Sequence, residues 1–143
     1  MTELYNKDIL RLATSIPLTE RLEAPDITVV RTSRICGSRV TADFIFDGDA
    51  ISAYGQGVKA CALGQASCSI FGRHILGQTR ETFAPVAEAM RRMLAGDGPA
   101  AKYLGGGEWA ELEIFLAARE HKSRHGSIML PFDAAMEAFD SLA

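Results

Sequence analysis

The sequence predicts an α+β domain in which helices cover one face of a small three-stranded antiparallel sheet. Three observations support this fold class. Residues 26–58 form three short strand-like runs, the apolar spacing becomes helical after residue 61, and strands and helices are grouped along the chain instead of alternating. Because no internal repeat or linker divides the chain, we expect a single domain over residues 1–143.

The first half of the chain is expected to supply one helix and the sheet. An amphipathic helix over residues 3–14 is ended by Pro17. The strands are predicted at residues 26–33, 39–46 and 50–58. The second strand alternates apolar and polar residues, which is typical of a half-buried antiparallel strand. Asp47-Gly48-Asp49 joins the last two strands as a tight turn, in which glycine provides the positive φ that such turns need.

The second half of the chain is predicted to be helical. A helix begins near Cys61 and closes at Gly77. A further helical stretch covers residues 79–95, and we expect Pro85 to break it into a short turn and a longer helix. Residues 96–99 end this stretch, and the remaining helices are expected at residues 108–120 and 127–142.

Composition and charge argue against several functional classes. The net charge of -3 and the lack of a clustered basic surface do not fit a nucleic-acid binder. No apolar stretch approaches the roughly 20 residues of a membrane span, and the N-terminus does not resemble a secretory signal. We therefore expect a cytoplasmic protein, in a compartment where thiols stay reduced. Neither a P-loop nor a nucleophile elbow is present, so we do not expect an enzyme.

The cysteines are the residues that carry chemistry in this chain. Cys36, followed by Gly37, lies between the first two strands, where glycine permits a sharp bend. Cys61 lies at a strand-to-helix junction, where a helix N-terminus stabilises a thiolate. Cys68 lies two turns further on, roughly 10 Å from Cys61, and is expected to be a small buried hydrophobe. That structural role is also open for Cys36 and Cys61 when only their local context is considered.

Together these motifs resemble one known family. Cys-Gly at a hairpin tip, an Asp-Gly turn, and a cysteine followed by Ala-Ser at the start of a helix occur in the same order in the NifU/IscU/SufU iron–sulfur cluster assembly scaffolds. The resemblance covers nearly the whole chain and is closest to the SufU branch. The matching positions are Tyr5, Ile9, Cys36-Gly37, Asp47-Gly48, Cys61, Gln65-Ala66-Ser67 and Gly77-Gln78-Thr79.

Two departures from the family pattern concern the site itself. The aspartate that follows Cys-Gly in the family is Ser38 here, and the third cysteine is replaced by Ser127, three residues before Leu130. A serine hydroxyl does not ionise near neutral pH and is a poor metal ligand, whereas it is a favoured N-cap for the last helix. The neighbouring His125 is a candidate replacement ligand, since histidine can take the place of cysteine at iron–sulfur and zinc sites.

The resemblance implies a scaffold that holds a transient 2Fe-2S cluster on Cys36, Cys61 and His125 or an exogenous thiol. It also implies a cysteine desulfurase and apo iron–sulfur acceptor or carrier proteins as partners. Two alternatives stay open. One is a zinc-bearing sulfur acceptor that receives a persulfide on Cys61, and the other is a metal-free protein that only binds assembly partners. Other histidines and acids, namely His74, His121, Asp43 and Asp133, are weaker ligand candidates.

Overall fold

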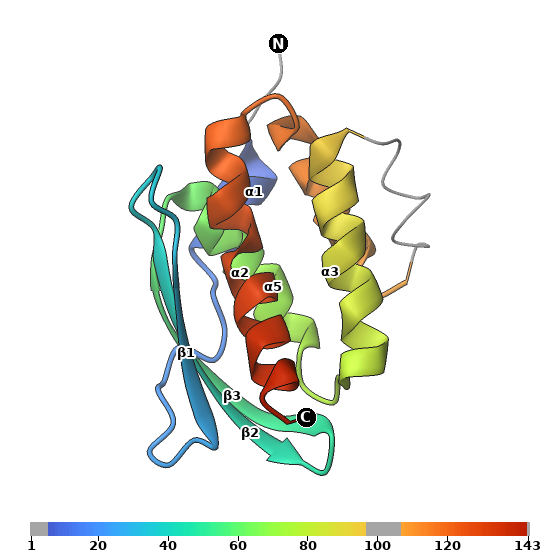
Figure 1. Cartoon of the computed structure of the whole chain (residues 1–143). Coiled ribbons are helices and arrows are strands. Elements are labelled where there is room, and N and C mark those ends of the chain that lie inside the picture. The colour runs from blue at the N-terminus through green and yellow to red at the C-terminus, as the bar shows by residue number, and fades with distance from the viewer. Residues whose placement is uncertain (1–5, 97–106, 143) are drawn as a thin grey trace.

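The computed structural model describes residues 6–96 and 107–142 and has the predicted α+β architecture (Figure 1). Its elements are α1 (Lys7–Ala13), β1 (Ile27–Thr32), β2 (Arg39–Asp47), β3 (Ala50–Lys59), α2 (Ala62–His74), α3 (Arg80–Ala95), the 3-10 helices η1 (Ala110–Ala118) and η2 (Lys122–Arg124), and α5 (His125–Asp140). Residues 3–5 of the predicted first helix and residues 97–99 of the predicted stop after residue 95 lie outside the described residues. Within the described part of the chain, no helix is both long enough and apolar enough to cross a membrane.

The three strands form an antiparallel sheet in the order β1-β2-β3. The tight turn predicted at residues 47–49 is present, with Asp47 paired with Ala50 and a φ of 66° at Gly48. Such a φ is favourable for glycine and strained for other residues, which confirms the role predicted for Gly48. At the other end of β2, Arg39 pairs with both Thr32 and Lys59, so the three strands end side by side where the β1–β2 hairpin turns.

The helices form layers on one face of the sheet, as predicted (Figure 1). Helices α2 and α5 lie directly on the strands, α3 packs on the outer side of α5, and α1 packs against α2. Buried aromatic rings join the layers. Phe71 of α2 contacts Tyr54 of β3 at a centroid distance of 5.2 Å and Phe132 of α5 at 5.7 Å, and Phe132 stacks on Phe83 of α3 at 5.8 Å. This continuous apolar core fixes the start of α2 relative to the sheet.

The opposite face of the sheet is partly covered by the segment between α1 and β1. Asp43 is fully buried on this face. Its carboxylate accepts hydrogen bonds from the Arg21 guanidinium, the Leu22 backbone N–H and the Thr28 hydroxyl. Burial alone would raise the pKa of Asp43, but these donors, Arg21 first, hold it below its ordinary value of 3.8. Asp43 is therefore a structural anchor and not a free oxygen ligand.

Helix α3 corrects the prediction for Pro85, because it runs without a break from Arg80 to Ala95. A proline at this position removes the N–H that would bond to Glu81. Pro85 lies on the exposed side of the helix, so water can reach the carbonyl that loses its partner. A capping box at Thr79 and a left-handed Gly96, with a φ of 90°, define the two ends of this helix.

The segment predicted as a helix over residues 108–120 is instead the 3-10 helix η1. Its buried side chains, Trp109, Leu112, Phe115 and Ala118, recur at intervals of three residues. This interval matches the 3.0 residues per turn of a 3-10 helix, so the tighter winding keeps all four side chains on the core.

The last helix also begins earlier than predicted, at His125. Ser127 consequently lies in the first turn of α5 and is not its N-cap. The N-cap residue is Arg124, which makes no capping hydrogen bond through its side chain. The hydroxyl of Ser127 is thus available for contacts outside its own helix.

Candidate functional site

The structure brings Cys36 and Cys61 together at one end of the sheet. Cys36 lies in the turn between β1 and β2, where Gly37 has a φ of 71°. Cys61 is the N-cap residue of α2, directly after β3, as predicted. Both are partly exposed and line one hollow of about 370 Å³, together with Gly37, Ser38, Lys59, Ala60 and Gln65. Two residues 25 positions apart in the sequence thus open onto the same surface.

Two buried hydroxyls connect the thiols. The Ser127 hydroxyl of α5 donates to Ser38 Oγ at 3.0 Å, and both serines are almost completely buried. Ser38 Oγ lies 3.3 Å from Cys36 Sγ, and Ser127 Oγ lies 3.5 Å from Cys61 Sγ. Since Ser127 gives its only proton to Ser38, the Ser38 hydroxyl remains free to donate to Cys36. The Ser38 proton is thus placed to stabilise a Cys36 thiolate.

The electrostatic surroundings of Cys36 agree with this direction. Partial burial raises the pKa of the Cys36 thiol, but hydrogen-bonding interactions with the Ser33 and Ser38 hydroxyls and the Ser38 backbone, together with a smaller effect of the Ser127 hydroxyl, outweigh it and lower the pKa to about 7. The Ser33 hydroxyl lies 3.3 Å from Cys36 Sγ. Cys36 is therefore about half ionised at neutral pH, and the thiolate is the form that binds metal or accepts sulfur.

Sequence reasoning missed Ser33, although the turn places it reliably. The backbone N–H of Gly37 donates to the Ser33 carbonyl at 2.8 Å, and the Ser33 N–H donates to the Ser38 carbonyl at 2.8 Å. This closed turn holds the Ser33 side chain over Cys36, three residues on. A serine three residues before a cysteine in a hairpin turn was the signal that could have identified it.

Two glycines let the three chain segments approach one another. A Cβ on Gly64 of α2 would overlap Ser127 Oγ, and a Cβ on Gly126 would lie 2.9 Å from Ser33 Oγ. The start of α5 is further tied to α2 by the buried Ser67 hydroxyl, which donates to the Ile128 carbonyl at 2.6 Å. The small residues Gly64 and Ser67 of α2 therefore shape the site directly.

The third cysteine takes no part in the site. Cys68 is completely buried, and burial raises the pKa of its thiol to about 12. Its backbone carbonyl accepts a hydrogen bond from the side chain of Gln56 at 3.4 Å. The expectation that Cys68 is a small core residue is confirmed.

The structure does not bring His125 to the two cysteines. Its Nε2 atom donates to the Ala118 carbonyl at 2.8 Å, and the residue lines a different hollow, beside Leu94, Ala95 and Gly96. Within residues 6–96 and 107–142, no group of three or more His, Cys, Asp or Glu side chains is placed to hold a metal ion. The expected set of Cys36, Cys61 and His125 is therefore not assembled in this conformation.

Two other candidate ligands, His74 and Asp133, have structural partners. His74 packs edge-on against Trp109 at a centroid distance of 5.3 Å. Asp133 bridges Arg91, at 2.9 Å, and Arg31, at 4.0 Å. Both residues are thus occupied away from the thiols.

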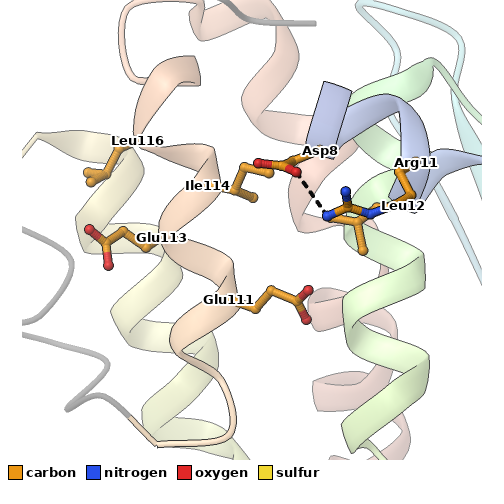
Figure 2. A pocket seen from close by; sticks show the side chains of 7 residues that line it. All are labelled: Asp8, Arg11, Leu12, Glu111, Glu113, Ile114 and Leu116. Carbon is orange, nitrogen blue, oxygen red and sulfur yellow. Dashed lines mark ion pairs between the residues drawn. The ribbon is translucent and has the colours of Figure 1, made fainter. Parts of the chain in front are cut away.

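A separate hollow of about 460 Å³ lies between α1 and η1 (Figure 2). Its walls contain no cysteine or histidine. Asp8 is paired with Arg11 at 2.8 Å, and Glu111 is paired with Arg73 at 3.0 Å. These two carboxylates are neutralised by neighbouring cations and leave Glu113 as the remaining acid of the lining, so this hollow offers no ligand set comparable with the cysteine site.

The cysteine site provides two of the four thiolate ligands that a 2Fe-2S cluster usually has. Four thiolates usually hold a 2Fe-2S cluster, and here two thiols share the site with two hydroxyls. The thiols are soft ligands suited to iron, whereas the hydroxyls of Ser38 and Ser127 bind iron weakly.

The fold and the site together define a small α+β protein with two surface thiols. One cysteine lies at the first hairpin of the sheet and the other at the start of the helix that follows the sheet. The N-terminal NifU-like protein of Brucella abortus is similar to this chain, with 35% identity over 98% of this chain and 94% of that one, and a TM-score of 0.90. The chain therefore belongs to the NifU/IscU/SufU-type family, which confirms the resemblance inferred from the sequence.

Two further solved structures share the fold at 21% identity. One is a putative iron–sulfur cluster assembly scaffold protein for the SUF system from Fervidobacterium islandicum, with a TM-score of 0.80 over 94% of this chain and 95% of that one. The other is described only as a hypothetical protein, with a TM-score of 0.81 over 98% of this chain and 99% of that one. No protein-family model and no curated protein matches the chain.

Proposed function

We propose that the protein is an iron–sulfur cluster assembly scaffold that holds a nascent 2Fe-2S cluster on Cys36 and Cys61 and passes it to acceptor proteins. The observation that carries the proposal is the convergence of these two thiols on one exposed hollow, in a chain of the NifU/IscU/SufU type. Each thiol loses its proton as its sulfur binds iron, and Cys36 is already half ionised near pH 7.

The serine pair gives the proposal a physical logic. A scaffold must release what it holds, and strong ligands on all four positions would oppose release. Ser38 and Ser127 stand beside the two thiols and contribute hydroxyls, which compete poorly for iron. A cluster bound at this site is therefore open to attack by the thiols of an acceptor protein.

The expected partners follow from this role. A cysteine desulfurase would supply sulfur, and apo iron–sulfur carriers or acceptors would receive the cluster. The proposed location is the cytoplasm, where exposed thiols such as Cys36 stay reduced. Holding a formed cluster and passing it to an acceptor needs ligand exchange only, so we assign no enzymatic activity to the scaffold.

One observation favours a second candidate, a sulfur acceptor that does not hold a cluster. The ionised Cys36 is suited to attack the outer sulfur of a desulfurase persulfide. In that step a new S–S bond forms on Cys36, the donor's S–S bond breaks, and the desulfurase cysteine leaves as a thiolate. The geometry favours Cys36 over Cys61 for this role, and two thiols fall short of the four ligands of a structural zinc site.

The test is anaerobic reconstitution with ferrous iron, cysteine and a desulfurase, followed by addition of an apo-ferredoxin. A scaffold develops a visible chromophore and then loses it to the ferredoxin. A sulfur acceptor shows no chromophore but gains 32 mass units, the mass of one sulfur atom (about 32 Da), on Cys36. A protein with neither signal and no bound zinc would contradict both candidates and favour a metal-free role in partner binding.

A further inference from the structure

Lysine and arginine residues lie beside the site cysteines in a chain whose net charge is -3. The three stretches of sequence that contribute residues to the site contain Lys and Arg but no Asp or Glu. These segments are residues 27–42, 50–80 and 121–132. The aspartate that the family places after Cys-Gly is also absent, because Ser38 occupies that position. No carboxylate of these segments therefore offsets the cations near the thiols.

Three of these cations are free to act on a ligand. Lys59 lines the same hollow as Cys36 and Cys61, and Arg39 is its cross-strand partner, so both side chains point to the same face of the sheet. Arg34 lies two residues before Cys36. All three are exposed, and within the described residues none makes an ion pair. Two like charges directly opposite each other repel, and a bound anion relieves this repulsion.

We propose that this site binds a carboxylate-bearing low-molecular-weight thiol, which supplies the thiolate ligands that Ser38 and Ser127 cannot. The role of this thiol as a cluster ligand rests on the proposed scaffold function. The selectivity for a carboxylate-bearing thiol rests on the cations Arg34, Arg39 and Lys59. The thiol of the small molecule gives up its proton as its sulfur binds iron, while its carboxylates lie near Lys59 and Arg39. A neutral or cationic thiol provides the same sulfur without this attraction.

The size and polarity of the hollow agree with such a ligand. Its volume of about 370 Å³ lies within the roughly 300–1,000 Å³ of small-molecule sites. Gln65 and the Ser38 hydroxyl add polar groups to the lining. A tripeptide thiol with two carboxylates, such as glutathione, can therefore reach both the thiols and the cations.

The first experiment needs no cluster and uses S-methylglutathione as the probe on the apo-protein. Binding is followed by NMR in wild type and in Arg39→Gln/Lys59→Gln. The matched control, Arg80→Gln/Arg92→Gln, removes the same charge from exposed cations that pair elsewhere, with Asp140 and Glu88. We expect binding to weaken about tenfold in the site variant and to change less than twofold in the control. We also expect the dimethyl ester of the probe to bind about tenfold more weakly to wild type.

The second experiment compares glutathione with 2-mercaptoethanol during reconstitution with iron and sulfide. The chromophore formed with glutathione should decay about tenfold faster in the site variant than in the control variant. High salt should also speed the decay of this chromophore in wild type, because it screens the attraction between carboxylates and cations. Equal behaviour of the two variants, or equal binding of probe and ester, would overturn the inference while leaving the scaffold function intact. Charge-dependent binding of S-methylglutathione without any chromophore would support the anion site and count against the scaffold function instead.

Discussion

The low pKa of Cys36 leads to a quantitative prediction for thiol reactivity. The pKa falls from its ordinary value of 9.0 to about 7, because hydroxyl donors outweigh the effect of burial. At pH 7 about half of Cys36 is thiolate, compared with about 1% for an unperturbed thiol, which is a gain of about 50-fold in the reactive form. A less basic thiolate is also a weaker nucleophile, by about 6–10-fold for two pKa units. Cys36 should therefore react about 5–8 times faster than an ordinary cysteine at pH 7.

The assay measures the rate of reaction with a neutral disulfide reagent, 4,4′-dithiodipyridine, between pH 5 and 10. The background is Cys61→Ala/Cys68→Ala, which leaves one reactive thiol and keeps the hydroxyls that contact it. The rate should rise with a midpoint near pH 7 and level off above about pH 8. An ordinary thiol continues to gain rate up to about pH 10 and overtakes Cys36 there.

The perturbation removes the hydroxyl donors one at a time. A hydrogen bond to a charged group contributes about 1.5–3 kcal/mol, and one pKa unit corresponds to about 1.4 kcal/mol. Because several donors share the thiolate, Ser33→Ala and Ser38→Ala should each raise the midpoint by about one unit. Ser52→Ala, an exposed serine that donates to the Ile45 carbonyl, is the control and should leave it unchanged. A rate midpoint near pH 9 in wild type, or a midpoint that stays the same in both Ser33→Ala and Ser38→Ala, would refute the reasoning.

Three further predictions concern the surroundings of the site. Ser127→Cys restores a third thiolate beside Cys61, and the reconstituted chromophore should persist about tenfold longer than in wild type, as followed by its decay in the presence of a chelator. Gly64→Ala would normally favour a helix by about 0.5–1 kcal/mol. Its Cβ overlaps Ser127 Oγ, however, and overpacking costs about 1–3 kcal/mol, so urea unfolding should show a net loss of about 1–2 kcal/mol. Asp43→Asn removes charge-assisted hydrogen bonds and should cost about 2 kcal/mol at pH 7. Because the pKa of folded Asp43 is below 3.8, this difference is complete above that value and should shrink as the pH falls below it, and a constant difference down to pH 2 would contradict the assignment.

The elements that position the cysteines could be predicted because local sequence determines them. The alternation of apolar and polar residues predicted the second strand, and Gly48 predicted the hairpin. The change from strand-like to helical spacing of apolar residues placed Cys61 at the start of α2. Errors arose where tertiary contacts decide the local structure. Pro85 is tolerated inside α3 because its face is exposed, and η1 winds as a 3-10 helix because its buried side chains recur every three residues.

The side chains of the site were less predictable than its backbone. His125 was expected to serve as a ligand because it lies close to Ser127 in the sequence, but residues two positions apart on a helix point to opposite sides, and its ring bonds to the Ala118 carbonyl. Ser127 was expected to cap α5, and its role became visible only when Gly64 and Ser38 were found beside it. The pairing of Asp43 with Arg21 across 22 residues could not be read from either local context.

The central claim is that Cys36 and Cys61 hold the cluster together, and the most direct test is the iron and sulfide content per chain after anaerobic reconstitution. We predict that wild type, Cys68→Ala and His125→Ala retain iron and sulfide in equal amounts. Cys36→Ser and Cys61→Ser should each lose at least about nine-tenths of both, since each removes half of the thiolate ligands. Retention of a full complement of iron and sulfide by either of these serine variants would contradict the claim.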